Sequence, residues 1–399
     1  MSDSARTGSL SSGVSRGMTL LFAIAGGAAV GNLYWAQPLL NTIADSFGIS
    51  MSLASLVVTV TQVGYAIGIF LLVPLGDTVN RRKVIPAMML LTVLALLATG
   101  LAPSFPALLA AVALLGVTTV AGQFLTPLAG DLATDEQRGR VLGTVASGLM
   151  LGLLIARAVS GIVAEFLGWR AIYFAAAVLI LILAVTMART IPDLEPRAQV
   201  PYGKLLASVV RTVVTDGRVR MTMMLGSLTL CVFTMFWTGL TFLLAADPYS
   251  YSTGLIGLIS LVGVAGAVAA QRAGRLYDRG HSLLGIGIGL LTALLALALT
   301  GIWGTSIIVV IVGIALFSIG SQSVQVLVQT RMLSIDPSAR SRLNTVFIVA
   351  NFIGGAIGGA LAGWFWQLGG WPALMIAAGA IVVLTLLVWL AQWIGARRN

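Results

Sequence analysis

Two stretches of this sequence decide its fold: LATDEQRGRVLGTV, from Leu132 to Val145, and LSIDPSARSRLNTV, from Leu333 to Val346. They align without a gap at a separation of 201 residues. Asp77 and Asp278, which lie in two other polar segments, are separated by the same 201 residues. Leu132, Asp135, Thr144 and Val145 recur as Leu333, Asp336, Thr345 and Val346. The shared register indicates that one structural unit is present twice.

The composition places both copies of this unit in a membrane. Hydrophobic residues make up 58% of the 399 residues and charged residues 9%, whereas a soluble domain carries about 25% charged residues. A water-soluble fold is therefore excluded. Because a membrane-spanning helix needs about 20 apolar residues, the charge-poor stretches predict twelve spans. They are Met18–Leu40, Ser52–Leu75, Val84–Leu101, Pro106–Gly130, Val141–Val163, Ala171–Met187, Met221–Ala245, Thr253–Gln271, Ser282–Gly301, Thr305–Gln329, Leu343–Trp366 and Pro372–Ile394.

The net charge of +10 follows the predicted topology. If the N-terminus is cytoplasmic, all Lys and Arg fall on the cytoplasmic side except Arg157, within a span, and Arg170, outside. This is the positive-inside distribution, so we expect both termini in the cytoplasm. The basic excess then indicates contact with the anionic lipid of the bilayer and no nucleic-acid binding.

The chain is expected to divide into two bundles of six helices. We assign residues 1–17 to a cytoplasmic tail, 18–188 to the first bundle, 189–220 to a cytoplasmic linker, 221–394 to the second bundle and 395–399 to a second tail. Within the linker, Leu205, Leu206, Val209, Val210 and Val213 recur at helical spacing. They predict an amphipathic helix on the membrane surface, and the alternative is a solvated connection. We expect no cleaved signal peptide before the first span, which would itself direct insertion.

The sequence offers no catalytic constellation. It contains one histidine, His281, and one cysteine, Cys231, so a disulfide within the chain and a cysteine-based metal site are excluded. No H-E-x-x-H or G-x-x-x-x-G-K-[ST] pattern occurs. We therefore expect no enzyme activity, no catalytic residue, no metal and no cofactor.

One cytoplasmic segment carries a family resemblance. PLGDTVNRRKV, from Pro74 to Val84, resembles the signature G-x-L-x-D-R-x-G-R-R/K of the major facilitator superfamily, and a weaker copy lies at Gly274–Gly280. The end of the first span resembles bacterial members near the drug:proton antiporter branch (DHA1-like, with twelve spans). The resemblance implies an all-α membrane fold of two pseudo-symmetric six-helix bundles. It also implies a bacterial inner-membrane location and a monomeric transporter that works by alternating access.

The resemblance also assigns a gate at the cytoplasmic ends of the helices. In the family, the signature Asp and a basic residue of the same turn bridge helices and stabilise the outward-open state. This implies gating roles for Asp77 and Arg81, with Asp131 as partner. The alternative is that these charges only anchor the topology. Arg82, Arg138 and Asp278 are assigned to the same gate.

Polar residues inside the spans predict a substrate-binding cavity. Spans one, four, seven and ten line the central cavity in this superfamily, and polar stripes fall on those spans. Arg157 lies in the middle of span five, where a charge costs about 2.5–3.5 kcal/mol. Hydrogen bonding between helices is the alternative explanation for each polar residue. The predicted cavity residues are Tyr34, Gln37, Gln123, Arg157, Trp237, Gln322, Gln325 and Asn351.

Two functions are compatible with these patterns. The first is export of a small organic molecule driven by protons, for which Asp45, Asp131, Glu165 and Asp247 are the candidate titratable groups. The second is a facilitator or symporter for an anionic or polar metabolite, with Arg157 as the anion site. Antiporters of the branch often carry a Gly-Pro-rich motif in span five and an R-x-x-Q-G motif in span four. Both are absent, which argues against proton-coupled drug antiport.

Overall fold

The computed structural model describes residues 13–193 and 201–398, with the backbone alone for residues 77, 78, 338 and 396–398. The described residues form helices and connecting turns, with no strand among them. The first half contains α1 Arg16–Gly31, η1 Gln37–Leu39, α2 Leu40–Phe47, α3 Met51–Ala54, α4 Leu56–Leu72, α5 Leu75–Thr78, α6 Arg81–Leu101, α7 Phe105–Thr118, α8 Ala121–Leu132, α9 Asp135–Leu167 and α10 Trp169–Thr190. The rest contains α11 Tyr202–Thr215, α12 Gly217–Ala245, α13 Thr253–Ile259, η2 Ser260–Gly263, α14 Val264–Asp278, α15 Ser282–Ile302, α16 Ile307–Ser334, η3 Pro337–Ala339 and α17 Arg340–Arg398.

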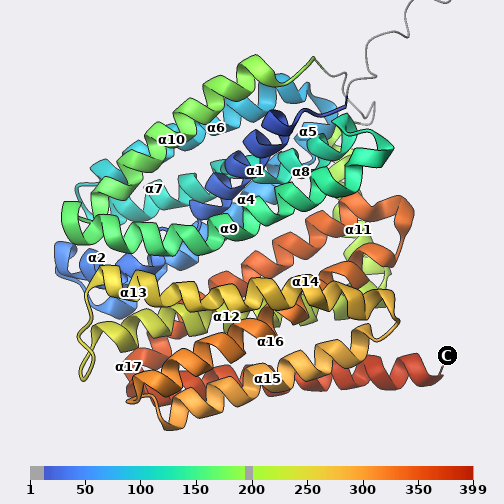
Figure 1. Cartoon of the computed structure of the whole chain (residues 1–399). Coiled ribbons are helices and arrows are strands. Elements are labelled where there is room, and N and C mark those ends of the chain that lie inside the picture. Colours follow the sequence, from blue (N-terminus) through green and yellow to red (C-terminus); the bar gives the residue numbers. More distant parts are fainter. Residues whose placement is uncertain (1–12, 194–200, 399) are drawn as a thin grey trace, which may run out of the picture.

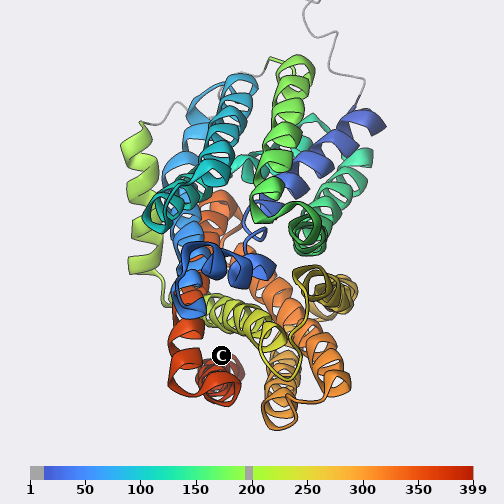
Figure 2. The same ribbon diagram turned by 90° about the vertical axis from the view of Figure 1, so that its left-hand side faces the viewer.

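The helices form two bundles, with α1–α10 at the top of Figure 1 and α12–α17 below them. In the first bundle α1 packs on α9, α4 on α7 and α6 on α10; in the second α12 packs on α17 and α14 and α15 on α16. The bundles meet where α4 contacts α17 and where α9 contacts α13. From the end of the molecule, α2 lies at the junction of the bundles, against α12 (Figure 2). The expected fold class is therefore confirmed.

Ten described helical segments are long and apolar enough to cross a membrane. One of them, within α17, contains the last two predicted spans, because the chain turns at Gly369 and Gly370. Gly370 has φ 61°, in the left-handed region that glycine adopts readily. The twelfth segment is α1, which is apolar but only 16 residues long.

The first span is not the continuous helix that its hydropathy predicts. The helix α1 ends at Gly31, a turn follows, and the chain resumes in η1 and α2. The turn is stabilised by Asn32, whose Nδ2 donates to Thr119 Oγ1 at 3.0 Å and whose Oδ1 accepts from Trp35 Nε1 at 2.9 Å. Thr119 lies between α7 and α8, where the fourth span is also interrupted. Two inner helices therefore break at one level and are joined there by side chains.

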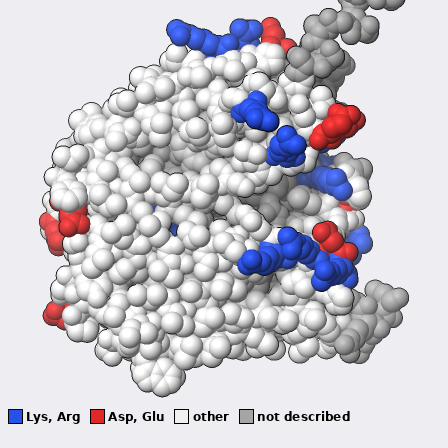
Figure 3. All heavy atoms as spheres, in the orientation of Figure 1, with Lys and Arg blue, Asp and Glu red and all other residues white. Residues whose placement is uncertain are grey.

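Charge divides the two ends of the molecule. Lys and Arg lie along the top and right of Figure 3, together with some Asp and Glu, whereas the charged residues visible at its left margin are Asp and Glu. We call the end where α6, α9 and α12 begin the basic end, and the end where α9 finishes the opposite end. The predicted linker residues 194–200 and the tail residues 1–12 and 399 lie outside the described part of the chain.

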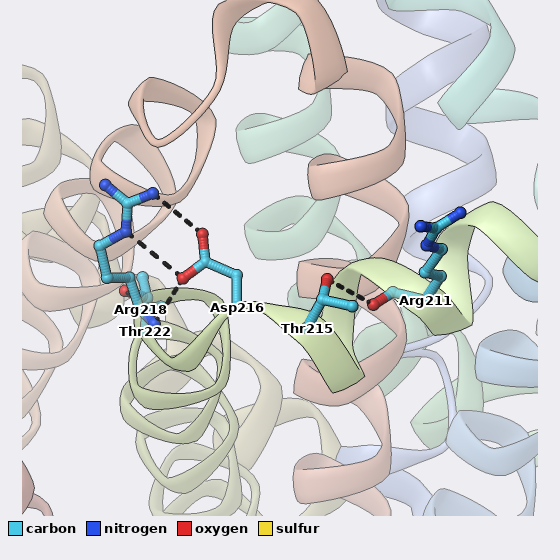
Figure 4. Close-up of polar contacts among 5 residues, drawn as sticks. All are labelled: Arg211, Thr215, Asp216, Arg218 and Thr222. Atoms are coloured by element: carbon cyan, nitrogen blue, oxygen red, sulfur yellow. Dashed lines mark hydrogen bonds and ion pairs between the residues drawn. The ribbon is translucent and has the colours of Figure 1, made fainter.

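Within the predicted linker, residues 202–215 form the helix α11, which packs on α12 and α17. Val209 is buried and Val210 is half exposed, so one side of the helix faces the protein. The following helix, α12, is capped by Asp216, whose side chain accepts from the backbone N–H of Arg218 at 2.8 Å. Its carboxylate also pairs with the Arg218 guanidinium at 3.0 Å (Figure 4). This ion pair holds the pKa of Asp216 below its usual value, chiefly through the hydrogen bond from Arg218.

Candidate functional site

A cavity of about 210 Å³ lies between the two bundles. Five of the eight predicted residues line it: Tyr34, Gln123, Gln322, Gln325 and Asn351. They come from the turn after α1 and from α8, α16 and α17, so helices of both bundles form one wall. The cavity extends toward the basic end, because its lining includes Gln329, close to the last residue of α16.

Arg157 lies beside this cavity, behind two of its lining residues. Its side chain is 2% exposed, and its Nε donates to Gln37 Oε1 at 2.7 Å. The guanidinium carbon lies 4.3 Å from the ring centre of Trp237, 5.0 Å from Tyr34 and 5.5 Å from Phe233. Such cation–π contacts contribute roughly 0.5–2 kcal/mol each. Gln37 and Trp237, the other two predicted residues, are thus Arg157 neighbours and not cavity-lining residues.

The buried charge of Arg157 lacks an anionic partner among the described residues. Both terminal nitrogens, Nη1 and Nη2, are buried without a hydrogen-bond partner, and so are Gln37 Nε2 and Trp237 Nε1. Buried polar groups in folded proteins are nearly always satisfied. The arrangement therefore presents several unused donors around one positive charge, at the level where the two bundles meet.

Other polar groups of the cavity are also unpaired. Gln325 Oε1 and Asn351 Oδ1 are buried without a partner in the described structure. In contrast, Gln123 Nε2 donates to the hydroxyl of Tyr65 at 3.0 Å. The ring of Tyr65 in turn meets Phe352 of the other bundle edge-on, with the centroids 4.5 Å apart. The cavity thus offers hydrogen-bonding groups on an aromatic wall.

Sequence reasoning missed several aromatic side chains of the site. Tyr65, Phe233, Phe347 and Phe352 line the cavity. In an apolar span, the sequence alone does not distinguish an aromatic residue that faces a cavity from one that faces lipid. Tyr65 lies three positions after the buried Gln62. This helical spacing is the one signal that could have placed it on an inner face.

The predicted gate residues lie at the basic end, where two of them form an ion pair and others are exposed. Arg81 and Asp131 form an ion pair at 2.8 Å, with side chains 9% and 25% exposed, and Arg81 Nε donates to the carbonyl of Gly76 at 3.1 Å. Arg82 and Asp278 are exposed. The side chain of Asp77 lies outside the described part of the structure.

Arg138 makes a more local contact than its gating assignment suggests. Its Nε donates to the carbonyl of Gly130, at the end of α8, at 3.1 Å. Its Nη1 lies 3.1 Å from Asp135 one turn earlier, but both side chains are well exposed. Surface ion pairs of this kind contribute roughly 0–1 kcal/mol. Arg138 therefore joins α8 to α9 within one bundle.

At the opposite end, polar side chains connect the two bundles directly. The hydroxyls of Thr42 and Thr253 lie 3.0 Å apart, and Ser252 donates to Glu165 Oε2 at 3.0 Å. Ser52 donates to the carbonyl of Gly363 at 2.6 Å. These contacts join the two bundles at the opposite end. Within the described ranges, no group of three or more His, Cys, Asp or Glu side chains is placed to hold a metal ion.

Comparison with known proteins agrees with this architecture. A family profile described as Major Facilitator Superfamily matches residues 19–337. The "Putative uncharacterized transporter YgaY" of Escherichia coli K12 is 41% identical over 388 residues, covering 97% of each chain. The "Probable transporter SCO4007" of Streptomyces coelicolor is 32% identical and covers 91% of this chain and 85% of its own.

Two solved structures share the fold at low sequence identity. The human organic anion transporter MFSD10 superimposes with a TM-score of 0.73 at 16% identity, covering 94% of this chain and all of the other. The nucleoside transporter NupG, solved as a point mutant, superimposes with a TM-score of 0.75 at 13% identity, covering 94% and 99%. At these identities the likeness shows the fold alone.

Proposed function

The chain belongs to the major facilitator superfamily and is a multi-pass membrane transporter, and we propose that its substrate is a small organic anion. The observation that carries this proposal is Arg157, a buried cation with two unpartnered terminal nitrogens and no carboxylate partner among the described residues. A carboxylate could accept from both nitrogens in the bidentate geometry that arginine favours.

The surroundings of Arg157 support a ligand more than a purely structural role. A buried structural cation is normally paired, because an isolated charge in a low-dielectric site is destabilising. Here the rings of Tyr34, Phe233 and Trp237 offset only part of that penalty. Tyr34 and Phe233 also line the cavity, so an anion entering from the basic end would meet Arg157 behind these two rings. The side-chain amides that line the cavity would bind the polar part of the substrate.

The transport cycle we infer is alternating access between the two bundles. The cavity extends toward the basic end, and the contacts through Thr42, Ser52 and Ser252 close the opposite end. Opening the opposite end would break these contacts and separate Arg157 from Trp237. In this cycle the Arg81–Asp131 pair, which lies within one bundle, would favour one state of the basic end.

We further infer that the protein lies in the bacterial inner membrane with its basic end and both termini in the cytoplasm. The distribution of Lys and Arg supports this orientation. One chain forms the whole cavity, which supports a transporter that works as a monomer.

The proposal is tested by transport into proteoliposomes containing the purified full chain. We expect exchange of small aromatic or cyclic carboxylates, and no exchange of matched amines or neutral amides. Arg157→Gln should abolish carboxylate exchange, whereas Arg157→Lys should retain part of it, because the charge remains but the bidentate fork is lost. Gly143→Ala, on the exposed face of α9, is the matched control. Unaltered carboxylate exchange by Arg157→Gln would exclude the anion site.

Proton-coupled export is the second candidate, and one contact favours it. Glu165 accepts a hydrogen bond from Ser252 across the opposite end, so opening that end would remove this contact from its carboxyl group. Among the described residues, the cavity lining itself contains no Asp, Glu or His. In proteoliposomes with an internal pH indicator, coupled export predicts a pH change that depends on substrate and is absent in Glu165→Gln. Export that leaves the internal pH constant excludes coupling.

A further inference from the structure

The unpaired amide, indole and guanidinium atoms that line the central cavity or surround Arg157 are sorted by kind. At Arg157 they are donors: its own Nη1 and Nη2, Nε2 of Gln37 and Nε1 of Trp237. On the walls formed by α16 and α17 they are acceptors: Oε1 of Gln325 and Oδ1 of Asn351. All are buried without a partner among the described residues, whereas buried polar atoms are nearly always paired. Both sets therefore indicate groups of a ligand.

The two sets lie at different depths, and α12 gives the scale. Asn351 lies against Gly226 of α12, because a Cβ added to that glycine would be 2.5 Å from Asn351 Oδ1. Arg157 lies against the rings of Phe233 and Trp237 on the same helix. From Gly226 to Phe233 the chain advances by 233 − 226 = 7 residues, which is about 10 Å at the rise of an α-helix. The acceptor of Asn351 is thus nearer the basic end than Arg157.

The helix α16 gives the same separation independently. Phe317 stacks on Phe233, with the ring centres 6.4 Å apart, so it marks the level of Arg157. Gln325 lies 325 − 317 = 8 residues further toward the basic end, which is about 12 Å along the helix. Both acceptors are therefore separated from the buried guanidinium by about 10 Å or more.

The part of the cavity between these levels is mainly apolar. Leu230, Phe347 and Phe352 contribute to its lining, and its volume is about 210 Å³. Pockets for drug-sized ligands measure about 300–1,000 Å³, so this one fits a smaller molecule. Aromatic walls favour a flat ring, which packs on them face to face or edge-on. The cavity therefore suits a single ring with a polar group at each end.

We propose that the substrate is an elongated aromatic carboxylate that carries a hydrogen-bond donor, such as a phenolic hydroxyl, at the end opposite the acid. This inference rests on the proposed function, because Arg157 binds the carboxylate in both. It adds that Gln325 and Asn351 select the substrate by accepting from its far end. A methyl ether at that end has no donor and leaves both acceptors buried and unpaired. A hydroxyl beside the acid is too far away to reach them.

The test measures equilibrium binding of radiolabelled para-hydroxycinnamate to the purified full chain and its displacement by unlabelled acids. The competitors are cinnamate, para-methoxycinnamate and ortho-hydroxycinnamate, which all keep the carboxylate. We expect each of them to compete about tenfold more weakly than unlabelled para-hydroxycinnamate, the equivalent of one hydrogen bond to an otherwise unpaired buried acceptor. Since the acid group is constant, the series isolates the far end of the molecule.

Two variants each remove one acceptor at nearly constant volume. Gln325→Met and Asn351→Leu should each reduce the preference for para-hydroxycinnamate over cinnamate to about threefold or less, because one of two acceptors remains. The double variant should show no preference. Gln271→Met, on the exposed face of α14 outside the cavity lining, is the matched control and should keep the full preference. Thermal unfolding without ligand checks that each variant is folded, and either single variant suffices for the test.

The outcomes separate this inference from the proposed function. Equal affinity of the wild type for all the acids overturns the donor at the far end and leaves the anion site intact. Tighter binding of the ortho isomer overturns the length of the substrate. A preference that persists in the double variant overturns the role of the two amides. If none of the acids binds to the wild type, the proposed anion site fails and this inference fails with it.

Discussion

Arg157 and Gly358 occupy equivalent positions in the two halves of the molecule, 201 residues apart, and their environments are opposite. On α9, Arg157 is a buried cation surrounded by rings from both bundles. On α17, Gly358 packs so tightly that an added Cβ would lie 2.1 Å from the carbonyl oxygen of Cys231. One copy of the repeat therefore places an arginine side chain where the other copy has no room for any side chain.

The two halves therefore share one arrangement of helices but contribute different kinds of side chain to the site. Close approach of α12 and α17 requires a small residue at their crossing. In the first half, the same crossing level is used to hold a charge between α1, α9 and α12. The site consequently takes its cation from one half and most of its amides, Gln322, Gln325 and Asn351, from the other.

The largest expected effect tests whether position 157 alone confers the charge preference. With a carboxylate identified by transport, wild-type protein should show a rise in unfolding temperature that Arg157→Gln abolishes. Loss of a buried charged contact should weaken binding by about 3 kcal/mol, on the order of a hundredfold. The unliganded variant should unfold no earlier than wild type, because an unpaired buried charge is removed. A ligand-induced shift that persists would contradict the division of roles.

Gly358→Ala should act on stability and leave the charge preference unchanged. The added methyl group collides with the backbone of α12, which cannot move as a flexible side chain can. We expect a loss of about 1–3 kcal/mol, as for other overpacked sites. Gly143→Ala, which has open space around it, should gain up to about 1 kcal/mol from helix propensity. Thermal unfolding compares the two. Equal behaviour of both variants would mean that α12 and α17 are not tightly packed in solution.

The sequence predicted the spans well because hydropathy is a property of single segments. The duplicated register was likewise visible, since it depends only on spacing. The break after α1 was not, because Asn32 is held there by Thr119 from a segment far along the chain. Pairings of this kind depend on tertiary structure, which no periodicity reports.

The site was predicted only in part, for a related physical reason. Polar residues in spans are rare enough to attract attention, and this found Gln123, Gln322 and Arg157. Periodicity does not say whether such a residue faces the cavity or lies behind it, as Gln37 does. Phe233, which bridges the cavity and Arg157, has the same apolar character as its lipid-facing neighbours.

The contacts that each half makes at the basic end allow a smaller test of the same asymmetry. A double-mutant cycle on Arg81→Gln and Asp131→Asn should give a coupling of about 1–2 kcal/mol, since the pair is charged and mostly buried. The corresponding cycle on Ser282→Ala and Arg331→Gln should give about 0.5–1 kcal/mol for a single hydrogen bond to a half-buried arginine. Chemical unfolding in one detergent measures both. A larger coupling in the second half would reverse the comparison.

The smallest expected effect concerns two helix caps that the 201-residue register makes equivalent. Ser15 accepts from the N–H of Met18 at 3.2 Å, and Asp216 accepts from the N–H of Arg218 at 2.8 Å. Replacing either by Ala should lower stability by about 0.5–1 kcal/mol at neutral pH. Only the second loss should depend on pH, because only Asp216 titrates, and salt should screen its ion pair with the exposed Arg218.

The sign of that dependence follows from the lowered pKa of the Asp216 carboxyl, which its hydrogen bond from Arg218 stabilises in the charged form. The stabilisation is complete above the unfolded value of about 3.9 and is lost as the pH falls through the folded pKa. The difference in unfolding temperature between wild type and Asp216→Ala should therefore shrink below about pH 4. For Ser15→Ala it should stay constant over the same range. If both differences shrink together, the acid sensitivity belongs to the whole fold, and the two caps act alike despite their different chemistry.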